Sequence, residues 1–155
     1  MTKIAIFDYG AGNIFSLKNA LEKQNATVGV QTQVNKLKGY DGIFLPGVGN
    51  FDPAIQSINR DSVNFLEIVD DIPVFGICLG MEMFFDKSQE GKEKGLGIIN
   101  GDVIVLPNTL KVPHMGWNAL EIKQENKILE GIENGSWVYF VHSYRANPTT
   151  QDVII

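Results

Sequence analysis

The chain has 155 residues, of which 44% are hydrophobic and 20% charged, and its formal net charge is −5. These values predict one soluble globular domain, residues 1–155, that is large enough to bury a sizeable core. The acidic balance argues against nucleic acid or an anionic membrane as the main partner. No stretch resembles a signal peptide or has the length to span a bilayer, so we expect a cytoplasmic protein.

The first half of the chain alternates short apolar runs with helical patterns. The runs that predict buried strands are 4–7, 27–31, 41–45 and 73–77. Ile14, Leu17 and Leu21 recur at helical spacing, and residues 51–70 are expected to be mostly helical, in two pieces. This order predicts a parallel sheet with helices on both faces.

The only cysteine, Cys78, lies where the fourth predicted strand meets a helix expected over 79–85. Gly76 and Gly80 flank it and allow strand and helix to approach closely around a sharp turn, as in a nucleophile elbow. Free N–H groups and the dipole at a helix N-terminus favour a thiolate there. An isolated cysteine is often only a small buried hydrophobe, but the flanking glycines favour a nucleophile.

Two glycine-bearing loops follow other predicted strands. Gly47-Val48-Gly49 directly follows the third strand, at the sheet edge where ligands bind in open α/β folds, and its unshielded N–H groups are candidate oxyanion donors. Residues 10–12 lack the third glycine and the acidic partner of a dinucleotide fingerprint, so we reject nucleotide binding there. No Cys/His cluster has zinc spacing, and we expect neither metal nor cofactor.

The second half changes character from Ile98 onward. Short extended runs joined by polar or Pro/Gly-bearing loops predict antiparallel strands added to the parallel core, at 102–106, 118–122, 137–141 and 152–155. The predicted fold class is therefore α/β: a mostly parallel sheet flanked by helices, with added antiparallel strands.

Five collinear stretches resemble class I glutamine amidotransferases and, more narrowly, the glutaminase subunits of imidazole glycerol phosphate synthase. They are residues 8–13, 45–49, 76–81, 112–118 and 139–144. The cysteine motif marks the class, and its combination with residues 114–118 is more specific. The resemblance implies a flavodoxin-like fold over residues 3–147, and a chain that is incomplete at its C-terminus.

The resemblance also implies a mechanism and a partner. Cys78 would attack the side-chain amide of glutamine, release ammonia and form a thioester that water hydrolyses. Backbone N–H groups of Leu79 and of the Gly47-Val48-Gly49 loop would stabilise the oxyanion. The implied glutamine-binding residues are Gly80, Glu82, Glu90, His142, Ser143 and Tyr144. The implied partner is the cyclase (barrel) subunit, in a heterodimer, contacted by Asn13, Met115, Trp117 and Asn118.

Two departures from the family pattern bear on activity. Glu82 stands where the family usually has glutamine, and a carboxylate one helical turn from Cys78 disfavours the thiolate. The family's His-x-Glu motif is absent, since neither His114 nor His142 is followed by it. We therefore expect a truncated family member that is inactive alone and exposes apolar surface near residues 153–155.

The sequence leaves three functions open. The first is a glutaminase subunit that supplies ammonia for imidazole glycerol phosphate in histidine biosynthesis. The second is a non-catalytic module that docks on the barrel partner, and the third is an amidotransferase subunit for amidination of surface-polysaccharide sugars. A more conservative interpretation of the 112–118 stretch makes Trp117 a core aromatic and His114 a satisfied surface-loop histidine.

Overall fold

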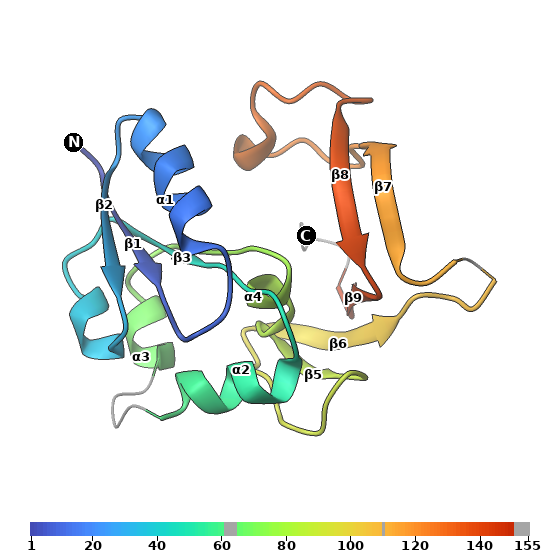
Figure 1. Cartoon of the computed structure of the whole chain (residues 1–155), viewed down its shortest axis with the longest axis horizontal. Helices are drawn as coiled ribbons and strands as arrows, with labels where there is room; N and C mark the ends of the chain where they lie inside the picture. Colours follow the sequence, from blue (N-terminus) through green and yellow to red (C-terminus); the bar gives the residue numbers. More distant parts are fainter. Residues whose placement is uncertain (61–64, 110, 151–155) are drawn as a thin grey trace.

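A four-stranded parallel sheet forms the centre of the computed structural model, which describes residues 1–60, 65–109 and 111–150. Its strand order is β2-β1-β3-β4 (Figure 1). The strands are β1 (Lys3–Phe7), β2 (Thr27–Gln31), β3 (Gly42–Leu45) and β4 (Val74–Gly76). Every pairing between them is parallel. The four strands predicted in the first half of the chain are confirmed, with small shifts at their ends.

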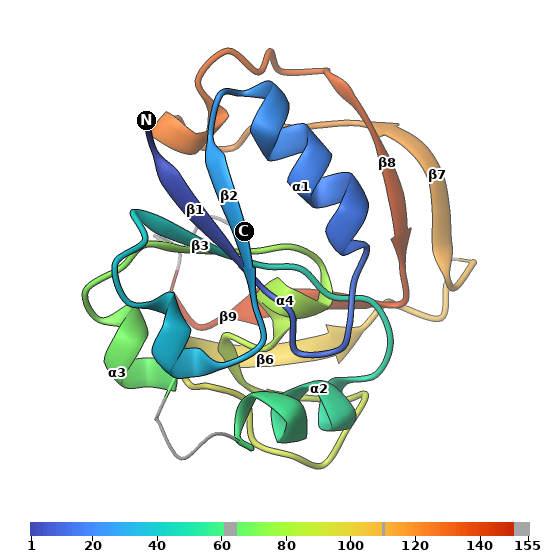
Figure 2. The same ribbon diagram turned by 60° about the vertical axis from the view of Figure 1, so that its left-hand side comes forward.

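Helices cover both sides of this sheet, as predicted. Figure 2 shows α1 (Ile14–Lys23) on one side and the 3-10 helix η1 (Val34–Leu37) with α3 (Phe65–Val69) on the other. The predicted 51–70 helix is two pieces, α2 (Phe51–Ile58) and α3. Apolar side chains of the sheet, η1, α2 and α3 form the main core, whereas α1 buries no residue completely.

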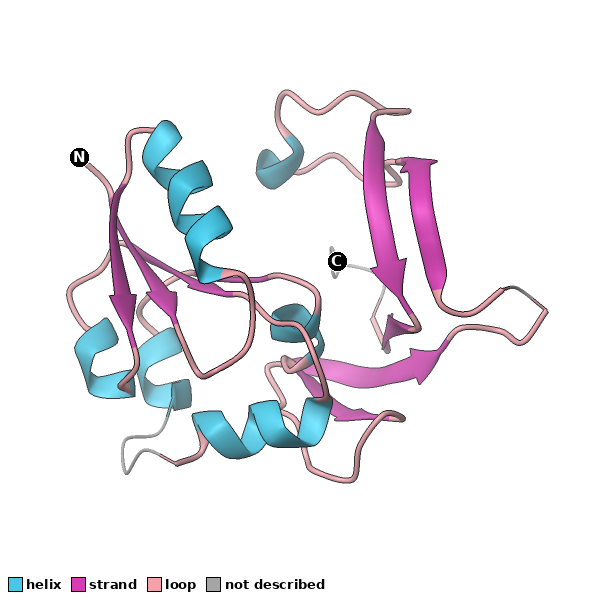
Figure 3. Cartoon of the chain, in the orientation of Figure 1, coloured by secondary structure: helices cyan, strands magenta, loops and turns pink. Residues whose placement is uncertain are grey.

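The second half of the chain builds two further sheets (Figure 3). One has the order β5-β6-β9, and the other is the hairpin β7-β8. Their bounds are β5 (Phe85–Ser88), β6 (Ile99–Val105), β7 (His114–Ala119), β8 (Trp137–His142) and β9 (Tyr144–Pro148), with a short 3-10 helix η2 (Lys127–Leu129) between β7 and β8. The antiparallel character is confirmed for β6-β9 and β7-β8, but β5-β6 is parallel. In the described residues these added strands pair with one another and not with the parallel sheet.

Two predicted elements are corrected. The helix after Cys78 is only α4 (Leu79–Glu82), because Phe85 instead starts β5 and packs with Val103 and Ala146 in a second small core. The strand expected over 118–122 is displaced to β7, since the chain leaves its pairing with β8 after Ala119. The strand expected at 152–155 lies outside the described residues.

One of the two edge strands of the parallel sheet is β4. Within the described residues no strand pairs with that edge. Phe75 on β4 is 46% exposed, and Ile77 just after it is also exposed. Such an edge leaves backbone groups open to pairing. None of the described helices has both the length and the apolar character required to cross a membrane.

Candidate active site

The turn at Cys78 has the geometry of a nucleophile elbow. β4 ends at Gly76, α4 begins at Leu79, and Cys78 between them has φ 53° and ψ −117°. A positive φ costs a non-glycine residue about 1–3 kcal/mol, and surrounding contacts must therefore hold the turn. The Ile77 N–H donates to the Leu45 carbonyl at 3.0 Å, and the Glu82 N–H donates to the Cys78 carbonyl at 3.0 Å.

The glycines that flank Cys78 are required by close packing. A Cβ on Gly80 would overlap the carbonyl oxygen of Leu45, at the end of the neighbouring strand β3. A Cβ on Gly76 would collide with the backbone of Met81 in α4. Strand and helix therefore approach as closely as the sequence predicted.

The Gly47-Val48-Gly49 loop lies against this elbow. A Cβ on Gly47 would be 2.9 Å from the backbone nitrogen of Gly80, so loop and helix are in contact. The Tyr9 hydroxyl donates to the Pro46 carbonyl and anchors the start of the loop. Burial, and then the charge of Cys78, raises the pKa of Tyr9, so this hydroxyl stays a donor. The loop that holds the proposed oxyanion donors thus contacts the helix that directly follows Cys78.

The electrostatic environment of Cys78 opposes a thiolate. Burial raises the pKa of the thiol, the charges of Glu82 and Glu90 raise it further, and only the Leu79 N–H lowers it. Cys78 is exposed, yet the walls of the elbow remove part of the hydration of its sulfur. The N–H at the start of the helix favours a thiolate, as expected, but burial and the two carboxylates outweigh it. α4 spans only four residues and has a small dipole.

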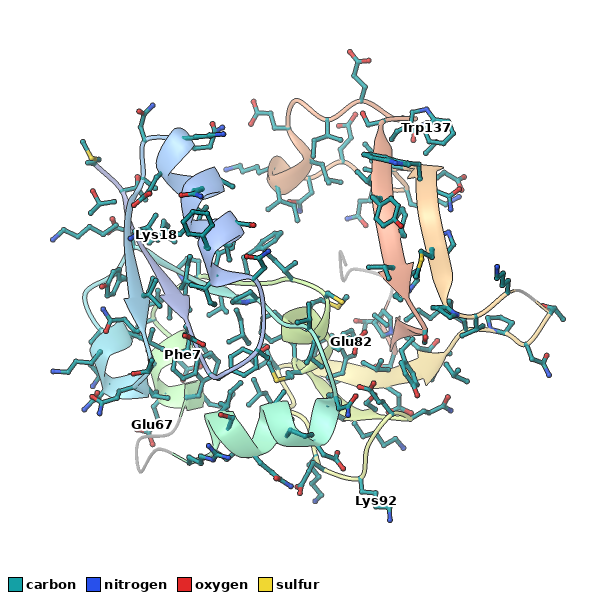
Figure 4. All side chains as sticks on the ribbon, in the orientation of Figure 1. Phe7, Lys18, Glu67, Glu82, Lys92 and Trp137 are labelled. Carbon is teal, nitrogen blue, oxygen red and sulfur yellow. The ribbon has the colours of Figure 1, made fainter. Side chains whose placement is uncertain are left out.

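Two carboxylates lie within electrostatic reach of this sulfur. Glu82 is only 8% exposed, and burial, followed by the charge of Glu90, raises its pKa to about 7. Figure 4 shows Glu82 in the interior of the molecule. Glu90 Oε2 accepts a hydrogen bond from the Phe51 N–H at 2.9 Å. The predicted contact residues Glu82 and Glu90 are thus brought together with Cys78.

The two histidines of the chain hydrogen-bond each other and do not reach the sulfur. His114 Nδ1 and His142 Nε2 lie 3.0 Å apart, across the β7-β8 pairing. His142 Nδ1 donates to the Tyr144 carbonyl at 2.8 Å, and the Asn118 amide contacts His114 Nε2. In the described part of the chain, no side chain hydrogen-bonds the Cys78 sulfur; its hydrogen bond comes from the Leu79 backbone.

The remaining predicted glutamine contacts lie at the start of β9. Tyr144 packs on the same small core as Met81 of α4, which links β9 to the elbow helix. The Ser143 carbonyl accepts from the Leu106 N–H at 2.9 Å. A cleft of about 1090 Å³ also opens at Cys78, between β4 and residues 120–129. Cys78 lines this cleft, but Ser143, Tyr144 and Glu90 do not.

One face of the β7-β8 hairpin carries large apolar side chains in solvent. We call it the hairpin face; its exposed residues are Met115, Trp117, Trp137, Tyr139 and Val141. Trp117 is 64% exposed and meets Tyr139 edge to face, with ring centroids 5.6 Å apart. The alternative that makes Trp117 a core aromatic is therefore wrong. Sequence reasoning missed the three β8 members, although their alternation along 137–141 signals one strand face.

The other predicted interface residues are placed separately. Asn13 caps α1, its Oδ1 accepting from the Ser16 N–H at 3.1 Å, and Asn118 is tied to His114. No group of three His, Cys, Asp or Glu residues suited to a metal ion occurs in the described ranges 1–60, 65–109 and 111–150.

Comparisons with known proteins place this geometry in a family. The model of the family "Glutamine amidotransferase class-I" matches residues 5–155. This chain belongs to that family. Among solved structures, a glutamine amidotransferase matches with a TM-score of 0.73 at 15% identity, over 96% of this chain and 75% of the other. A putative GMP synthase subunit from Thermoplasma acidophilum matches with a TM-score of 0.66 at 19% identity, over 98% and 70%. These two show the class I amidotransferase fold.

Closer relatives within the amidotransferase family are known by sequence. The imidazole glycerol phosphate synthase subunit HisH of Archaeoglobus fulgidus is 46% identical, over 97% of this chain and 77% of its own length. The HisH subunit of Methanocaldococcus jannaschii is 44% identical, over 98% and 78%. The family assignment predicted from five short motifs is confirmed.

We expect Gly80→Ala to destabilise the protein by about 3 kcal/mol, because the new methyl group would push α4 away from the Leu45 carbonyl. Gly10→Ala is the control: no atom lies within 4 Å of its would-be Cβ, so only the positive φ of 95° penalises it, by about 1 kcal/mol. Denaturant unfolding measures both variants. Equal losses in the two variants would contradict the packing account.

Glu82→Gln should stabilise the protein in a pH-dependent way. The folded state raises the pKa of Glu82 from 4.5 to about 7, so stability is lost as pH rises through this range and the carboxylate ionises. The gain in Glu82→Gln should therefore grow across that window and reach about 3 kcal/mol above it. The Cys78 pKa should fall at the same time, which alkylation rates against pH would report.

The control for this experiment is Glu67→Gln, which removes an exposed carboxylate from α3 (Figure 4). Its free energy of unfolding should differ little from that of the wild type across the same pH range. A gain in Glu82→Gln that does not change with pH would rule out a titrating Glu82.

Proposed function

We propose that this chain is the glutaminase subunit of an imidazole glycerol phosphate synthase, which releases ammonia from glutamine for a cyclase partner. The observation that carries the proposal is the strained Cys78 elbow in contact with the Gly47-Val48-Gly49 loop. Two relatives, at 44% and 46% identity, are both named as HisH subunits of that synthase, and they support the choice of this synthase among amidotransferases. A cytoplasmic location stays a prediction from the sequence.

Each residue of the proposed site has a chemical task. The Cys78 sulfur attacks the amide carbon, ammonia leaves, and water later hydrolyses the thioester. N–H groups of Leu79 and the Gly47-Val48-Gly49 loop stabilise the oxyanion. The Glu90 carboxylate, with one oxygen on Phe51 N–H, offers its second oxygen to the α-ammonium group of glutamine.

A base is required, because the thiol is the resting form. Burial, Glu82 and Glu90 all raise the pKa of Cys78, so the proton must be taken by a neighbouring group. Both ring nitrogens of His142 are engaged, with His114 and with the Tyr144 carbonyl. We therefore propose that residues 1–155 alone do not turn over glutamine, and that a base must be brought to Cys78 from outside them.

The same observations favour a second candidate, a non-catalytic module that only docks on the cyclase. Both candidates share the docking surface, which we assign to the hairpin face; Asn13 and Asn118 stay predicted contacts outside that face. Exposed tryptophan, tyrosine and methionine side chains on one strand face are the composition of an interface core. The two candidates differ in whether the glutamine pocket forms.

Labelling of Cys78 with a glutamine-analogue electrophile separates the candidates. For the glutaminase we expect saturable labelling, one molecule per chain, that glutamine protects against and Cys78→Ser abolishes, without turnover of glutamine. Mass spectrometry of the intact chain, with and without the cyclase partner, gives the stoichiometry. Absence of labelling in both conditions would favour the docking module. Glutamine turnover by the purified chain that Cys78→Ser abolishes would refute the proposed need for an added base.

Trp117→Ala should weaken binding to the cyclase partner by about 30-fold, because large aromatic anchors dominate such interfaces. Calorimetric titration of the two purified proteins measures the change. Val30→Ala, which trims an exposed apolar side chain on β2, is the control and should bind like the wild type. Equal affinities of Trp117→Ala and wild type would exclude the hairpin face as the interface.

A further inference from the structure

The loop that carries Glu90 is hydrogen-bonded to a carboxylate of α2. Asp52, in the first turn of α2, accepts hydrogen bonds from two successive backbone N–H groups of the loop. Its Oδ1 lies 2.9 Å from the nitrogens of both Lys92 and Glu93, and its Oδ2 lies 3.1 Å from that of Lys92. Charge-assisted hydrogen bonds of this kind are among the strongest in proteins. Asp52 therefore fixes the backbone next to Glu90.

The loop is shaped for this contact. A Cβ on Gly91 would overlap Asp52 Oδ1, so a glycine is needed where the loop passes the carboxylate. A second, weaker link joins the same two elements, since Gln56 Nε2 donates to Glu93 Oε1 at 2.9 Å. Figure 4 shows Lys92 projecting away from the molecule beneath α2, so the loop presents its backbone to the helix.

Glu90 in turn forms a hydrogen bond with the first residue of α2. The Asn50 side chain makes no capping hydrogen bond at the start of α2, and Glu90 Oε2 instead accepts the Phe51 N–H. α2 thus holds the loop through Asp52, and the loop caps α2 through Glu90. The helix start also directly follows the Gly47-Val48-Gly49 loop.

We propose that Asp52 is a positioning residue: its hydrogen bonds from the N–H groups of Lys92 and Glu93 hold the Glu90 carboxylate at the start of α2, within electrostatic reach of Cys78. This inference rests on the proposed function only for the task of Glu90, which is to bind the glutamine ammonium group. The position of Glu90 has a second consequence that does not depend on glutamine, namely its effect on the Cys78 thiol.

The thiol reports the position of Glu90 without any turnover. The charges that raise the pKa of Cys78 are those of Glu82 and Glu90. If Asp52 holds Glu90 in place, Asp52→Ala should shift the pH profile of Cys78 alkylation to lower pH, in the same direction as Glu90→Gln. The double variant should show no larger shift than Glu90→Gln alone, because the two changes act through one group.

The matched control is Gln56→Ala, which removes the weaker link to the same loop and should leave the alkylation profile unchanged. Asp52→Asn keeps one acceptor oxygen for the loop N–H groups and should give an intermediate profile, which decides the question if Asp52→Ala does not fold. A wild-type profile in folded Asp52→Ala or Asp52→Asn would overturn the proposal. An Asp52→Ala shift that adds fully to that of Glu90→Gln would overturn it as well.

Labelling with the glutamine analogue tests the link to substrate. The half-saturating analogue concentration should rise about five-fold in Asp52→Ala, with the maximal labelling rate nearly unchanged, as expected for a lost binding contact. Unchanged half-saturation beside a shifted alkylation profile would overturn the substrate role of the Asp52–Glu90 pair. If the wild type is not labelled at all, the proposed function fails, and the alkylation profiles still decide the positioning role.

Discussion

The site depends on one strained backbone conformation. Cys78 has a positive φ, and such a residue stays in place only when its surroundings leave no alternative. Here the alternatives are removed by the contact of Gly80 with Leu45 and by the hydrogen bond from Ile77 to the same carbonyl. That one carbonyl, at the end of β3, thereby fixes the sulfur and begins the loop that lies beside it. The proposed nucleophile and the loop of proposed oxyanion donors are thus positioned by the same few atoms.

Substrate binding and nucleophile ionisation place opposite electrostatic requirements on the proposed glutaminase. A carboxylate is needed to bind the ammonium group of glutamine, but the same negative charge disfavours the thiolate that must attack. Two features of the molecule reduce this conflict. Glu82 titrates near pH 7, so part of the population carries one negative charge fewer. The ammonium group of bound glutamine would lie against the Glu90 carboxylate and offset its negative charge. Cys78 would therefore be easier to ionise when substrate is present than when it is absent.

The features that sequence patterns predicted correctly are those that depend on residues close together in the chain. Continuous apolar runs mark strands buried on both faces, and the glycines two residues either side of Cys78 mark the elbow. The misses depend on distant residues. Phe85 leaves the helical pattern because Val103 and Ala146 form its core. The thiol is the resting form chiefly because burial raises the pKa of Cys78, and that burial depends on how distant parts of the chain pack around the elbow; Glu82 and then Glu90, from a later loop, add to it. The apolar face of β7 turns to solvent rather than inward, which a periodicity cannot reveal.

The hydrogen bonds of the histidine pair determine which ring nitrogen of His114 and of His142 carries a proton. A backbone carbonyl only accepts, so the bond to Tyr144 places a proton on His142 Nδ1. His142 Nε2 then accepts from His114 Nδ1, and His114 Nε2 accepts from the Asn118 amide. The line of donors runs in one direction, from β7 to β9. Either ring can be replaced without loss only by a side chain that donates at one end and accepts at the other, as an amide does and a lysine does not.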